Sequence, residues 1–526
     1  MCTTSIVTRV SALPFSLSPL EVEIFDLLLD CAAAASSLPP PPPDAGDDAL
    51  NPFPSPVIRV AGGWVRDKLL GLENDDIDFA LDTCTGNQFA RLVGKTLIER
   101  YGEGEKGKTG HVAVIMANPE QSKHLETATM RVLGLPLDFV DLRQEEYSST
   151  SRIPTITFGT PKSDAERRDF TINALFFNVT TCEVEDFTER GRTDLASKIM
   201  RTPLEPHITF LDDPLRVLRL VRFSARFQFS LEQSTRESAS RDDVKLALGE
   251  KVSRERVGTE LEGMFTGTTP DPALALETIN ELGLLSVVFK VDGVDGDIES
   301  IYSGVGMDGV RRVPSIASLS PRIDLRLLYI ITLLRPFRNI PHSNKKQKFV
   351  TSYIIRESIK WKNSDVDTVT LVLNLLDDVC SVVNDINGDK FDFTNVDVLG
   401  ELRMTVGLLL KQLKENWITA TALAVVHMDK TATGTFNKTV SFVINKLQID
   451  DCWKGKPKLD GKTIIKSLGL PKGPTVGIYM AESTRHTFRF PKKTPDELIE
   501  LLKEFKKVED AREKIEAEAK KKEEEK

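Results

Sequence analysis

Short apolar runs rich in β-branched and aromatic residues recur along the first third of the chain, with segments of helical composition between them. Such runs predict the strands of a compact α/β or α+β region. The predicted strands are residues 57–61, 76–78, 111–116, 137–142, 155–158 and 174–179. Residues 65–72, between the first two strands, have the composition of a helix.

From about residue 205 the composition and periodicity of the sequence predict helices. The predicted helical segments are residues 214–226, 230–249, 254–265, 272–285, 324–334, 366–386, 396–414 and 420–427. Residues 286–322 are irregular and rich in glycine, which predicts a loop or an insertion. Residues 497–526 mix acidic and basic side chains, which predicts a solvated charged helix or frayed tail with no implied partner.

The N-terminal part of the chain divides into a helix and a linker. Residues 18–31 predict a short amphipathic helix, and residues 32–56 contain a run of prolines that precludes regular structure. We therefore expect residues 1–56 to form an extension with a disordered linker, followed by the folded region that begins at residue 57.

The size and charge of the chain limit its class. At 526 residues it is long enough for more than one domain. A net charge of −9 argues against a protein that coats nucleic acid indiscriminately, although it allows a local basic groove. No apolar run reaches the length of a membrane span, so we expect no membrane association.

The cysteines and histidines favour carboxylates as the ligands of any bound metal. The six cysteines are scattered without a C-x-x-C pair, which favours a reducing compartment and no structural zinc. The six histidines are equally dispersed. The first dozen residues contain Arg9, several hydroxyl residues and no acid, a composition that hints at organellar targeting.

A glycine turn followed by two acids is the clearest chemical signal. Gly62 and Gly63 come between a predicted strand and a predicted helix, where backbone N–H groups can approach a polyphosphate. Asp76 and Asp78 follow on the next strand, and residues two apart on a strand point to the same side. A phosphate cradle with paired oxygen ligands predicts Mg²⁺-dependent phosphoryl or nucleotidyl transfer. It is not a dinucleotide fingerprint, because Arg66 stands near the place of the third glycine.

A third acid is available on a later strand. Asp138 and Asp141 are three residues apart, so on a regular strand they face opposite sides and only one can join the first two acids. The pattern does not choose between them, and either could instead be an ordinary acid at a strand edge.

Two further blocks supply arginines. Arg168 and Asp169 could bind phosphate or ribose oxygens, or form a surface salt-bridge cluster. Helical spacing places Arg219, Arg222 and Arg226 within a narrow arc, with Arg216 beside it. This stripe, backed by apolar residues, predicts binding of nucleotide or RNA; the alternative is a solvated amphipathic face.

Five blocks together resemble the class II tRNA nucleotidyltransferases, the CCA-adding enzymes, in their eukaryotic form. The blocks are GGWVRD with DID, DFVDLR, RRDFTINA, DDPLRVLRLVRF and VSRER, and they occur in the family's order over residues 57–265. The stretches HLETA, VEDFTERGRTDL and LDGKTIIKSLGLPKGP add to the resemblance with the eukaryotic branch. One departure is Asp212, where many relatives have glutamate.

The resemblance implies an α+β fold. A mixed-sheet nucleotidyltransferase head, similar to that of polymerase beta, would be followed by an all-α neck, body and tail. The implied divisions are residues 1–56 for the extension, 57–203 for the catalytic head, 204–270 for the nucleotide-selecting neck, 271–450 for the body and 451–526 for the tRNA-binding tail.

The resemblance also implies a role for each matching residue. Asp76 and Asp78 would bind two Mg²⁺ ions, and the third acidic position falls on Asp138. The implied triphosphate-binding residues are Gly62, Gly63, Arg66 and Asp67. The implied ribose and phosphate ligands are Arg168, Asp169 and Asn173. The implied base-selecting residues, led by a pair that mimics a template, are Asp213, Arg216, Arg219 and Arg222. The implied helix-bracing residues are Ser253, Glu255 and Arg256.

The function that these residues imply is addition of CCA to tRNA 3′ ends from CTP and ATP, without a nucleic-acid template and with release of pyrophosphate. Alternatives are an A-adding or poly(A)-adding relative, an inactive tRNA-binding scaffold, and a metal-dependent phosphohydrolase. We expect tRNA, CTP and ATP as partners, no obligatory protein partner, and a cytoplasmic or nuclear location with a possible mitochondrial pool.

Overall fold

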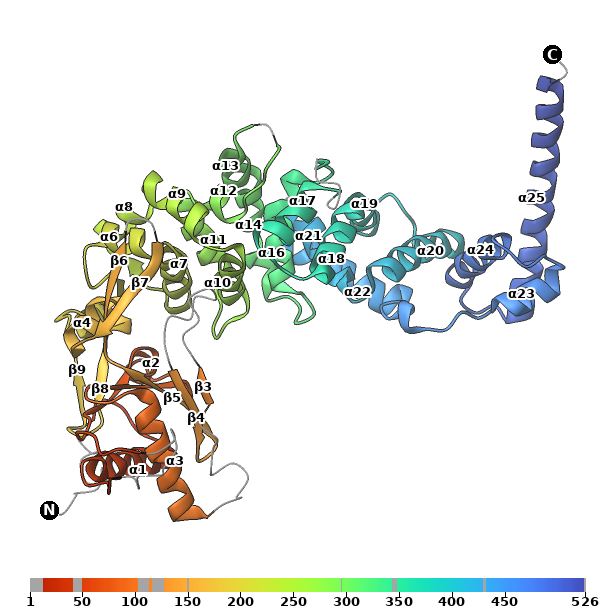
Figure 1. Cartoon of the computed structure of the whole chain (residues 1–526). Helices are drawn as coiled ribbons and strands as arrows, with labels where there is room; N and C mark the ends of the chain where they lie inside the picture. Colours follow the sequence, from red (N-terminus) through yellow and green to blue (C-terminus); the bar gives the residue numbers. More distant parts are fainter. Residues whose placement is uncertain are drawn as a thin grey trace. The chain divides into compact units, whose positions relative to one another are not determined.

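The chain forms two compact units, Met1–Val288 and Phe289–Lys526. A computed structural model describes residues 13–40, 50–102, 113–115, 127–148, 151–294, 296–342, 348–428 and 432–524. The first unit contains a mixed sheet and helices, and the second is helical (Figure 1). The predicted α+β class is therefore confirmed.

The described part of the first unit contains a seven-stranded sheet with the order β3-β4-β5-β2-β1-β8-β9. Its strands are β1 Ile58–Ala61, β2 Ile77–Leu81, β3 Ala113–Ile115, β4 Thr127–Val132, β5 Leu135–Asp141, β8 Phe176–Asn178 and β9 Glu183–Glu185. Neighbouring strands are antiparallel except β2 and β5, which are parallel. Of the strand predicted at 111–116, residues 111, 112 and 116 lie outside the described residues. The run at 155–158 is part of a separate hairpin, β6 Arg143–Ser148 with β7 Ser151–Phe158.

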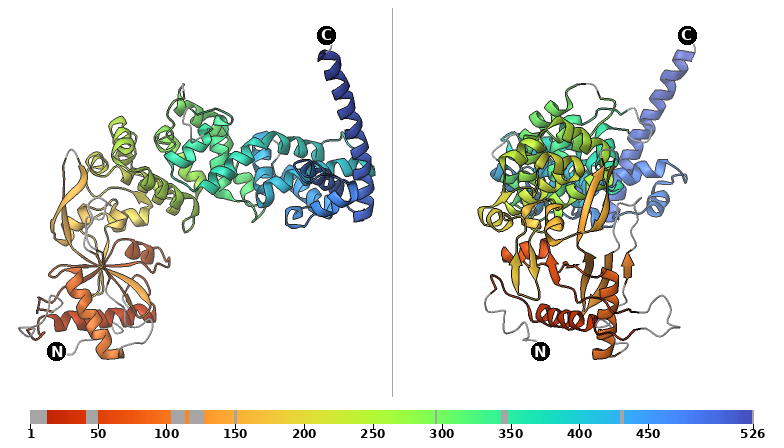
Figure 2. Two further views of the ribbon diagram at one scale, coloured as in Figure 1. Left: turned by 45° about the vertical axis from the view of Figure 1, so that its right-hand side comes forward. Right: turned by 60° about the vertical axis from the view of Figure 1, so that its left-hand side comes forward.

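Two helices cover one face of this sheet. They are α1 Pro19–Ala35 and α3 Gly86–Tyr101, which lie side by side in Figure 2. Phe79 and Phe139 are cross-strand partners on β2 and β5, and their rings stack 5.4 Å apart. Phe25 of α1 packs on Phe79, and Phe89 of α3 packs on Phe139. Because side chains alternate along a strand, this aromatic layer turns the intervening acids to the opposite face.

The helix predicted at 18–31 is confirmed, but the linker prediction is partly wrong. A capping box between Ser18 and Glu21 begins α1, which continues through the alanines to Ala35. Phe53 is buried, and its N–H donates to the carbonyl of Ala35 at 3.2 Å. The second half of the linker is therefore packed on the first unit, because the phenylalanine has an apolar site to fill. Residues 41–49 lie outside the described residues.

The rest of the first unit is mainly helical. Its helices are α2 Gly63–Leu69, α4 Pro161–Glu166, α5 Gly191–Ser197, α6 Pro206–Asp212, α7 Leu215–Phe227, α8 Gln233–Ala239, α9 Asp242–Lys251, α10 Arg254–Thr266, α11 Pro272–Glu281 and α12 Leu285–Val288, with the 3₁₀ turn η4 Thr171–Asn173. The prediction of an all-α neck needs a small correction. Strand β11 Ser230–Leu231 pairs in parallel with β10 Ile199–Met200, because the chain after α7 returns alongside the end of the head.

The second unit contains further helices. They are α13 Ile298–Ile301, η5 Tyr302–Gly306, α14 Met307–Val310, α15 Pro314–Ala317, α16 Leu325–Leu334, η6 Arg335–Phe337, α17 Val350–Tyr353, η7 Ile354–Ser358, α18 Asn363–Asn374, α19 Leu376–Asn387, α20 Val396–Leu413, η8 Lys414–Asn416, α21 Trp417–Met428, α22 Ala432–Ser441, η9 Phe442–Leu447, η10 Cys452–Lys454, α23 Gly461–Leu468, α24 Thr475–Arg489 and α25 Pro495–Glu524. The single helix predicted at 366–386 is divided between α18 and α19. No helix among the described residues of the chain has the length and apolarity to cross a membrane.

The prediction of an irregular loop at 286–322 is wrong, since this segment forms short helices around a buried core. Tyr302 is fully buried, and its hydroxyl donates to the carbonyl of Phe289 at 2.8 Å. The glycines allow close packing against α16. A Cβ atom at Gly306 would lie 2.9 Å from the carbonyl oxygen of Leu333, and one at Gly309 would lie 2.6 Å from Thr332 Cγ2. Tertiary contact therefore outweighed the low helix propensity of glycine.

Gly86→Ala tests how closely α3 approaches the sheet. A Cβ atom at Gly86 would lie 2.1 Å from the carbonyl oxygen of Phe139, so the helix must move away from β5. We expect a loss of about 3 kcal/mol in unfolding free energy, measured by urea unfolding. Gly249→Ala in α9 is the control, because its nearest contact would be an ordinary 3.9 Å and alanine favours a helix. Equal stability of the two variants would contradict the close approach.

Candidate active site

Residues from three of the five sequence blocks meet at one cavity of about 750 Å³ in the first unit. The predicted residues that line it are Gly62, Gly63, Arg66, Asp67, Asp76, Asp78, Arg168, Asp169, Asn173, Asp213, Arg216, Arg219, Arg222 and Arg226. The predicted residues outside its lining are Asp138, Ser253, Glu255 and Arg256. Segments more than 130 residues apart in sequence therefore share one polar wall.

The glycine turn lies directly against the RRDFTINA block. Gly62 has φ +73°, a conformation that favours glycine, and its N–H donates to the carbonyl of Leu175 at 3.0 Å. A Cβ atom here would lie 2.7 Å from Arg168 Nη1 and 3.3 Å from the carbonyl oxygen of Asn173. Glycine is therefore required both by the backbone angle and by the space available.

The two acids of the DID block lie at the start of β2. Asp76 immediately precedes the strand and is exposed, whereas Asp78 is its second residue and is half-buried. The parallel register of β2 and β5 places Asp138 opposite Asp78, and Thr129 Oγ1 donates to Asp138 at 2.6 Å. Asp141 instead accepts a hydrogen bond from the backbone N–H of Gly86 at 2.8 Å. Of the two acids that the pattern left open, the fold brings Asp138 beside Asp78.

These carboxylates can supply only some of the ligands of a Mg²⁺ ion, and the remaining ligands would come from water and substrate. No group of three or more His, Cys, Asp or Glu side chains in the described residues is arranged to hold a metal ion. Mg²⁺ usually takes one or two protein carboxylates and completes its shell with water and substrate phosphates. Two hard oxygen donors at the edge of an arginine-lined cavity match that requirement.

Arg66 connects α2, which follows the glycine turn, with η4 and α7. Its Nε donates to Asp67 Oδ1 at 2.8 Å, and its Nη1 donates to Asn173 Oδ1 at 2.5 Å. The guanidinium lies 5.1 Å from the ring centroid of Phe223 and 4.7 Å from that of Phe227, both on α7. Burial lowers the pKa of Arg66, although Asp67 opposes this effect. The predicted triphosphate residue Asp67 is likewise buried, and Arg226 approaches it at 3.6 Å.

Asp169 links the RRDFTINA block to α7. Its carboxylate accepts from Arg219 Nε at 2.7 Å, from Asn173 Nδ2 at 3.0 Å and from the N–H of Phe170 at 2.9 Å. Burial alone raises the pKa of Asp169, but Arg219 and Asn173 outweigh burial, so this pKa lies below its ordinary value. Asp169 is therefore held as a carboxylate inside the wall of the cavity.

The predicted base-selecting pair lies where α6 passes into α7. Asp213 Oδ1 accepts from the N–H of Leu215 at 3.3 Å, and Asp213 Oδ2 lies 3.5 Å from Arg256 Nη2. Arg216 is buried and donates through Nη2 to the carbonyl of Arg167 at 2.7 Å. The acid and the arginine thus lie three residues apart on one wall.

The three residues of the VSRER block differ in their surroundings. Arg256 is the one paired with Asp213, whereas Ser253 and Glu255 are exposed. Ser253 begins α10 without a side-chain capping bond. The neighbouring Arg254, which was not predicted, donates to the carbonyls of Val287 and Val288.

Two buried acids that hold the arginines were not predicted from the sequence. Glu260 lies 3.0 Å from Arg222 Nε and 3.9 Å from Arg219 Nη1. Burial raises the pKa of Glu260, against the effect of both arginines. Asp164 accepts from Arg167 and Arg168 at 2.5 and 2.9 Å. The three- and four-residue spacing after Asp164 was a usable signal, whereas nothing local marks Glu260 as the partner of α7.

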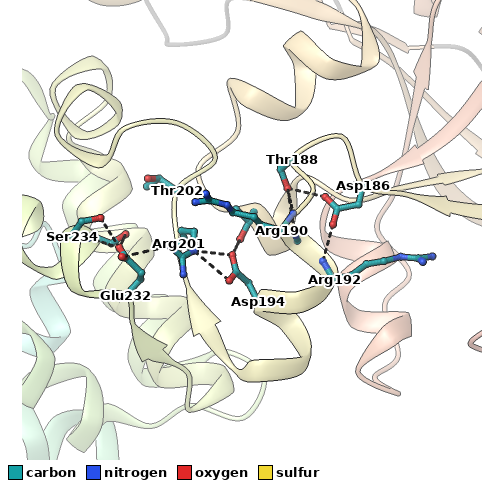
Figure 3. A network of polar contacts seen from close by, with 12 residues as sticks. Asp186, Thr188, Arg190, Arg192, Asp194, Arg201, Thr202, Glu232 and Ser234 are labelled. Carbon is teal, nitrogen blue, oxygen red and sulfur yellow. Dashed lines mark hydrogen bonds and ion pairs between the residues drawn. The ribbon is translucent and has the colours of Figure 1, made fainter.

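A second polar network, also missed, supports the turn that contains Asn173. Asp194 accepts from the hydroxyl of Thr171 at 2.8 Å and from Arg201 Nε at 3.2 Å. Arg201 Nη1 lies 3.5 Å from Glu232, so that the contacts run from the head to the start of α8 (Figure 3). The 3₁₀ turn η4 is therefore held in place by Asp194 and Arg201, which do not line the cavity.

Comparison with known proteins places the same segments in a known family. Residues 58–201 match the poly A polymerase head domain. The chain is 34% identical over 497 residues to the mitochondrial CCA tRNA nucleotidyltransferase of Saccharomyces cerevisiae, covering 86% of this chain and 88% of that protein. It is 32% identical to tRNA nucleotidyltransferase cca2 of Schizosaccharomyces pombe, covering 85% and 92%.

A solved structure shares the fold. The CCA-adding enzyme of Thermotoga maritima, in its complex with tRNA, has a TM-score of 0.60 at 18% identity, covering 95% of this chain and 98% of that one. The predicted mixed-sheet head with a largely helical remainder thus agrees with a known architecture.

Asp169→Asn tests the buried pairing with Arg219. Because the pKa of Asp169 is lowered in the folded chain, its stabilisation is present above the unfolded pKa of about 3.9 and is lost as the pH falls through the folded value. We expect the variant to lose about 3 kcal/mol of unfolding free energy at pH 7. In urea unfolding the deficit should be unchanged at pH 5.5 and should shrink below pH 4.

Asp76→Asn, at an exposed position on the rim, serves as the control and should change stability by less than about 0.5 kcal/mol. A deficit of Asp169→Asn that grew toward low pH would contradict the pairing.

Proposed function

The chain belongs to the family of CCA tRNA nucleotidyltransferases, and from this membership we propose that it completes tRNA 3′ ends with CMP, CMP and AMP taken from CTP and ATP, without a nucleic-acid template. The identity with the S. cerevisiae enzyme over most of both chains is the observation on which the proposal rests. The cavity supports it, because acids for a metal and arginines for a nucleotide line the same wall.

We assign the acids of the DID block to metal binding. Asp76 and Asp78 would hold Mg²⁺ at the start of β2, with Asp138 next to Asp78 on β5. When bound, Mg²⁺ supplies Lewis-acid stabilisation of the attacking 3′ oxygen and of the pyrophosphate that leaves. Asp138, with its hydrogen bond from Thr129, is the carboxylate nearest in register to take the proton of the RNA 3′-hydroxyl.

We assign the triphosphate to the glycine turn. The backbone of Gly62 and Gly63 can approach phosphate oxygens, since neither residue has a side chain in the way. Arg66 and Asp67 shape this turn through their own ion pair. Arg168, held by Asp164, and the Asp169–Asn173 pair form the neighbouring wall, where the ribose would lie.

We assign the nucleobase to Asp213 and Arg216. Cytosine and adenine both present an exocyclic amino donor beside a ring acceptor, and one carboxylate with one guanidinium is complementary to that edge. Guanine and uracil present the reverse order and would leave both protein groups unpaired, at a large cost. Arg219 and Arg222 continue the wall along α7, each fixed by a buried acid.

The five-part division into extension, head, neck, body and tail remains a prediction, as does tRNA binding by the tail. A mitochondrial pool beside a cytoplasmic or nuclear one also remains a prediction. The mitochondrial designation of the S. cerevisiae relative adds support for that pool.

The proposed activity is tested with purified protein, Mg²⁺ and tRNA that lacks its CCA end. Product length by gel should increase by three nucleotides with CTP and ATP, and by two with CTP alone, which a strict A-adding enzyme could not do. Asp78→Ala should lower kcat by at least about 10²–10³-fold, because charge on the reacting oxygens loses its stabilisation.

Glu183→Ala, which removes an exposed acid on the edge strand β9 of the same sheet, is the control. Absence of extension by the native chain would refute the proposed activity. Undiminished turnover and Mg²⁺ binding by Asp78→Ala would refute the metal assignment.

Arg216→Ala tests base selection. Without the guanidinium the edge of CTP or ATP loses a donor, whereas the metal and triphosphate contacts remain. We expect discrimination against UTP and GTP to fall by about 10²-fold, and phosphodiester formation to fall much less. Discrimination is the ratio of the incorporation efficiencies of two nucleotides. Because both are measured on one preparation, this ratio is insensitive to partial unfolding.

Arg236→Ala, which breaks an exposed ion pair between Arg236 of α8 and Glu281 of α11, should leave that ratio unchanged. Unchanged fidelity of Arg216→Ala would reject the template role.

A further inference from the structure

Glu21 of α1 is a buried carboxylate that does not line the cavity, with 5% of its surface exposed. The segment that matches the family's head domain begins only at residue 58, so α1 lies outside it. A buried carboxylate is costly unless it is paired and hydrogen-bonded. Its partners therefore show what it holds in place.

Two of its partners belong to α2, the helix that begins at the glycine turn. Trp64 Nε1 donates to Glu21 Oε1 at 3.1 Å, and Lys68 Nζ donates to Oε2 at 2.8 Å. Lys68 Nζ also lies 5.3 Å from the ring centroid of Trp64, which is fully buried. Glu21 thus binds α2 at two successive turns, and Arg66 and Asp67 lie between its two contacts.

The same carboxylate begins its own helix. The N–H of Ser18 donates to Glu21 Oε2 at 2.7 Å, and the N–H of Glu21 donates to Ser18 Oγ at 3.2 Å, which is a capping box. The position of α2 is therefore tied to the well-defined N-terminus of α1 through a single side chain.

The aromatic residues of α1 extend this support to the acid strand. The ring of Phe25 lies 5.9 Å from that of Trp64 and 6.0 Å from that of Phe79. Phe79 follows Asp78 on β2 and points to the opposite face. Helix α1 consequently lies behind both the glycine turn and the acids.

We propose that Glu21 is a positioning residue for the nucleotide triphosphate. It fixes α2, and with it the backbone of Gly63 and the Arg66–Asp67 pair, at the triphosphate end of the cavity. Helix α1 is then a working part of the catalytic head and not a detachable extension. The proposal rests on the proposed function for its kinetic readout, but its structural readout is independent of it.

This role has a kinetic signature that general stabilisation lacks. CTP and ATP share the triphosphate and differ in the base, which Asp213 and Arg216 would bind on another element. A shift of α2 should therefore raise KM for both nucleotides by the same factor, with kcat and base selection unchanged. Loss of folded protein would instead lower the apparent kcat and leave KM unchanged.

Glu21→Gln is the variant of choice. Glutamine has a single acceptor oxygen, so it can still accept from Trp64, but its NH2 group then faces Lys68 Nζ and the N–H of Ser18. The variant therefore removes the charge and the acceptor that Lys68 requires, together with part of the capping box, for which Ser18→Ala is the control. We expect KM for CTP and for ATP to rise about five- to tenfold, with kcat within about twofold of the native value. Lys68→Met should have the same effect, and the double variant should be no worse than either, because the two groups form one interaction.

Two controls lie on the same helix. Glu23→Gln changes an exposed acid whose partner is Tyr101 of α3 and should leave KM unchanged. Ser18→Ala removes the capping hydroxyl but keeps the contacts of Glu21 with α2, so it should lower Tm without raising KM.

Hydrogen exchange of the native chain and of Glu21→Gln, without substrates, is the structural readout. Amides of residues 63–70 should exchange faster in the variant, whatever the activity of the chain proves to be. Native-like KM with a loss of Tm equal to that of Ser18→Ala would overturn the positioning role, as would unchanged exchange of residues 63–70. Failure of the native chain to extend tRNA would refute the proposed function alone, since the exchange result still decides the role of Glu21.

Discussion

The wall of the cavity depends on neutralisation of buried charge. Arginines of α7 and acids of the head and of α10 are largely withdrawn from water, where an unpaired ion would cost several kcal/mol. Several are paired with an opposite charge from another element, as in Asp169 with Arg219 and Glu260 with Arg222. Arg216 instead donates to the backbone carbonyl of Arg167. Because the partners come from different segments, the pairs fix the elements relative to one another as well as neutralising charge. The result is a rigid polar surface prepared for an anionic ligand, which is an arrangement that favours electrostatic catalysis.

The hydrophobic layer on the other face of the sheet determines which side chains of β2 point to the cavity. Side chains alternate along β2, so that Phe79 points into the layer formed with Phe25 while Asp78 points to the cavity. A slip of one residue in the pairing of β2 would exchange these faces and bury the acid. Packing of α1 and α3 on the back of the sheet therefore protects the chemistry on the front, even though neither helix contributes a wall of the cavity.

The errors of sequence interpretation have a common physical origin. Glycines at 306 and 309 resemble loop residues, yet they permit contact with α16 that no local pattern reveals. Phe53 lies in a proline-rich stretch of loop composition, but it fills an apolar site beside Ala35. In each case a long-range contact stabilised a structure that local propensity disfavours.

The sequence by itself predicted five strands of the seven-stranded head sheet, β1, β2, β3, β5 and β8, but not β4 or β9. It also determined the two acids of the DID block and the arginine face of α7. These features depend on periodicity and on turn residues, which act between near neighbours in the chain. Only the tertiary structure placed Asp138 beside Asp78, because strand register decides which side chains are adjacent. It also showed that Asp141 accepts a hydrogen bond from Gly86, the first residue of α3. It likewise identified Glu260, Asp194 and Glu21 as partners of distant residues. A buried acid has no distinctive local signal, since its pairing is a property of the folded interior and not of its position in the sequence.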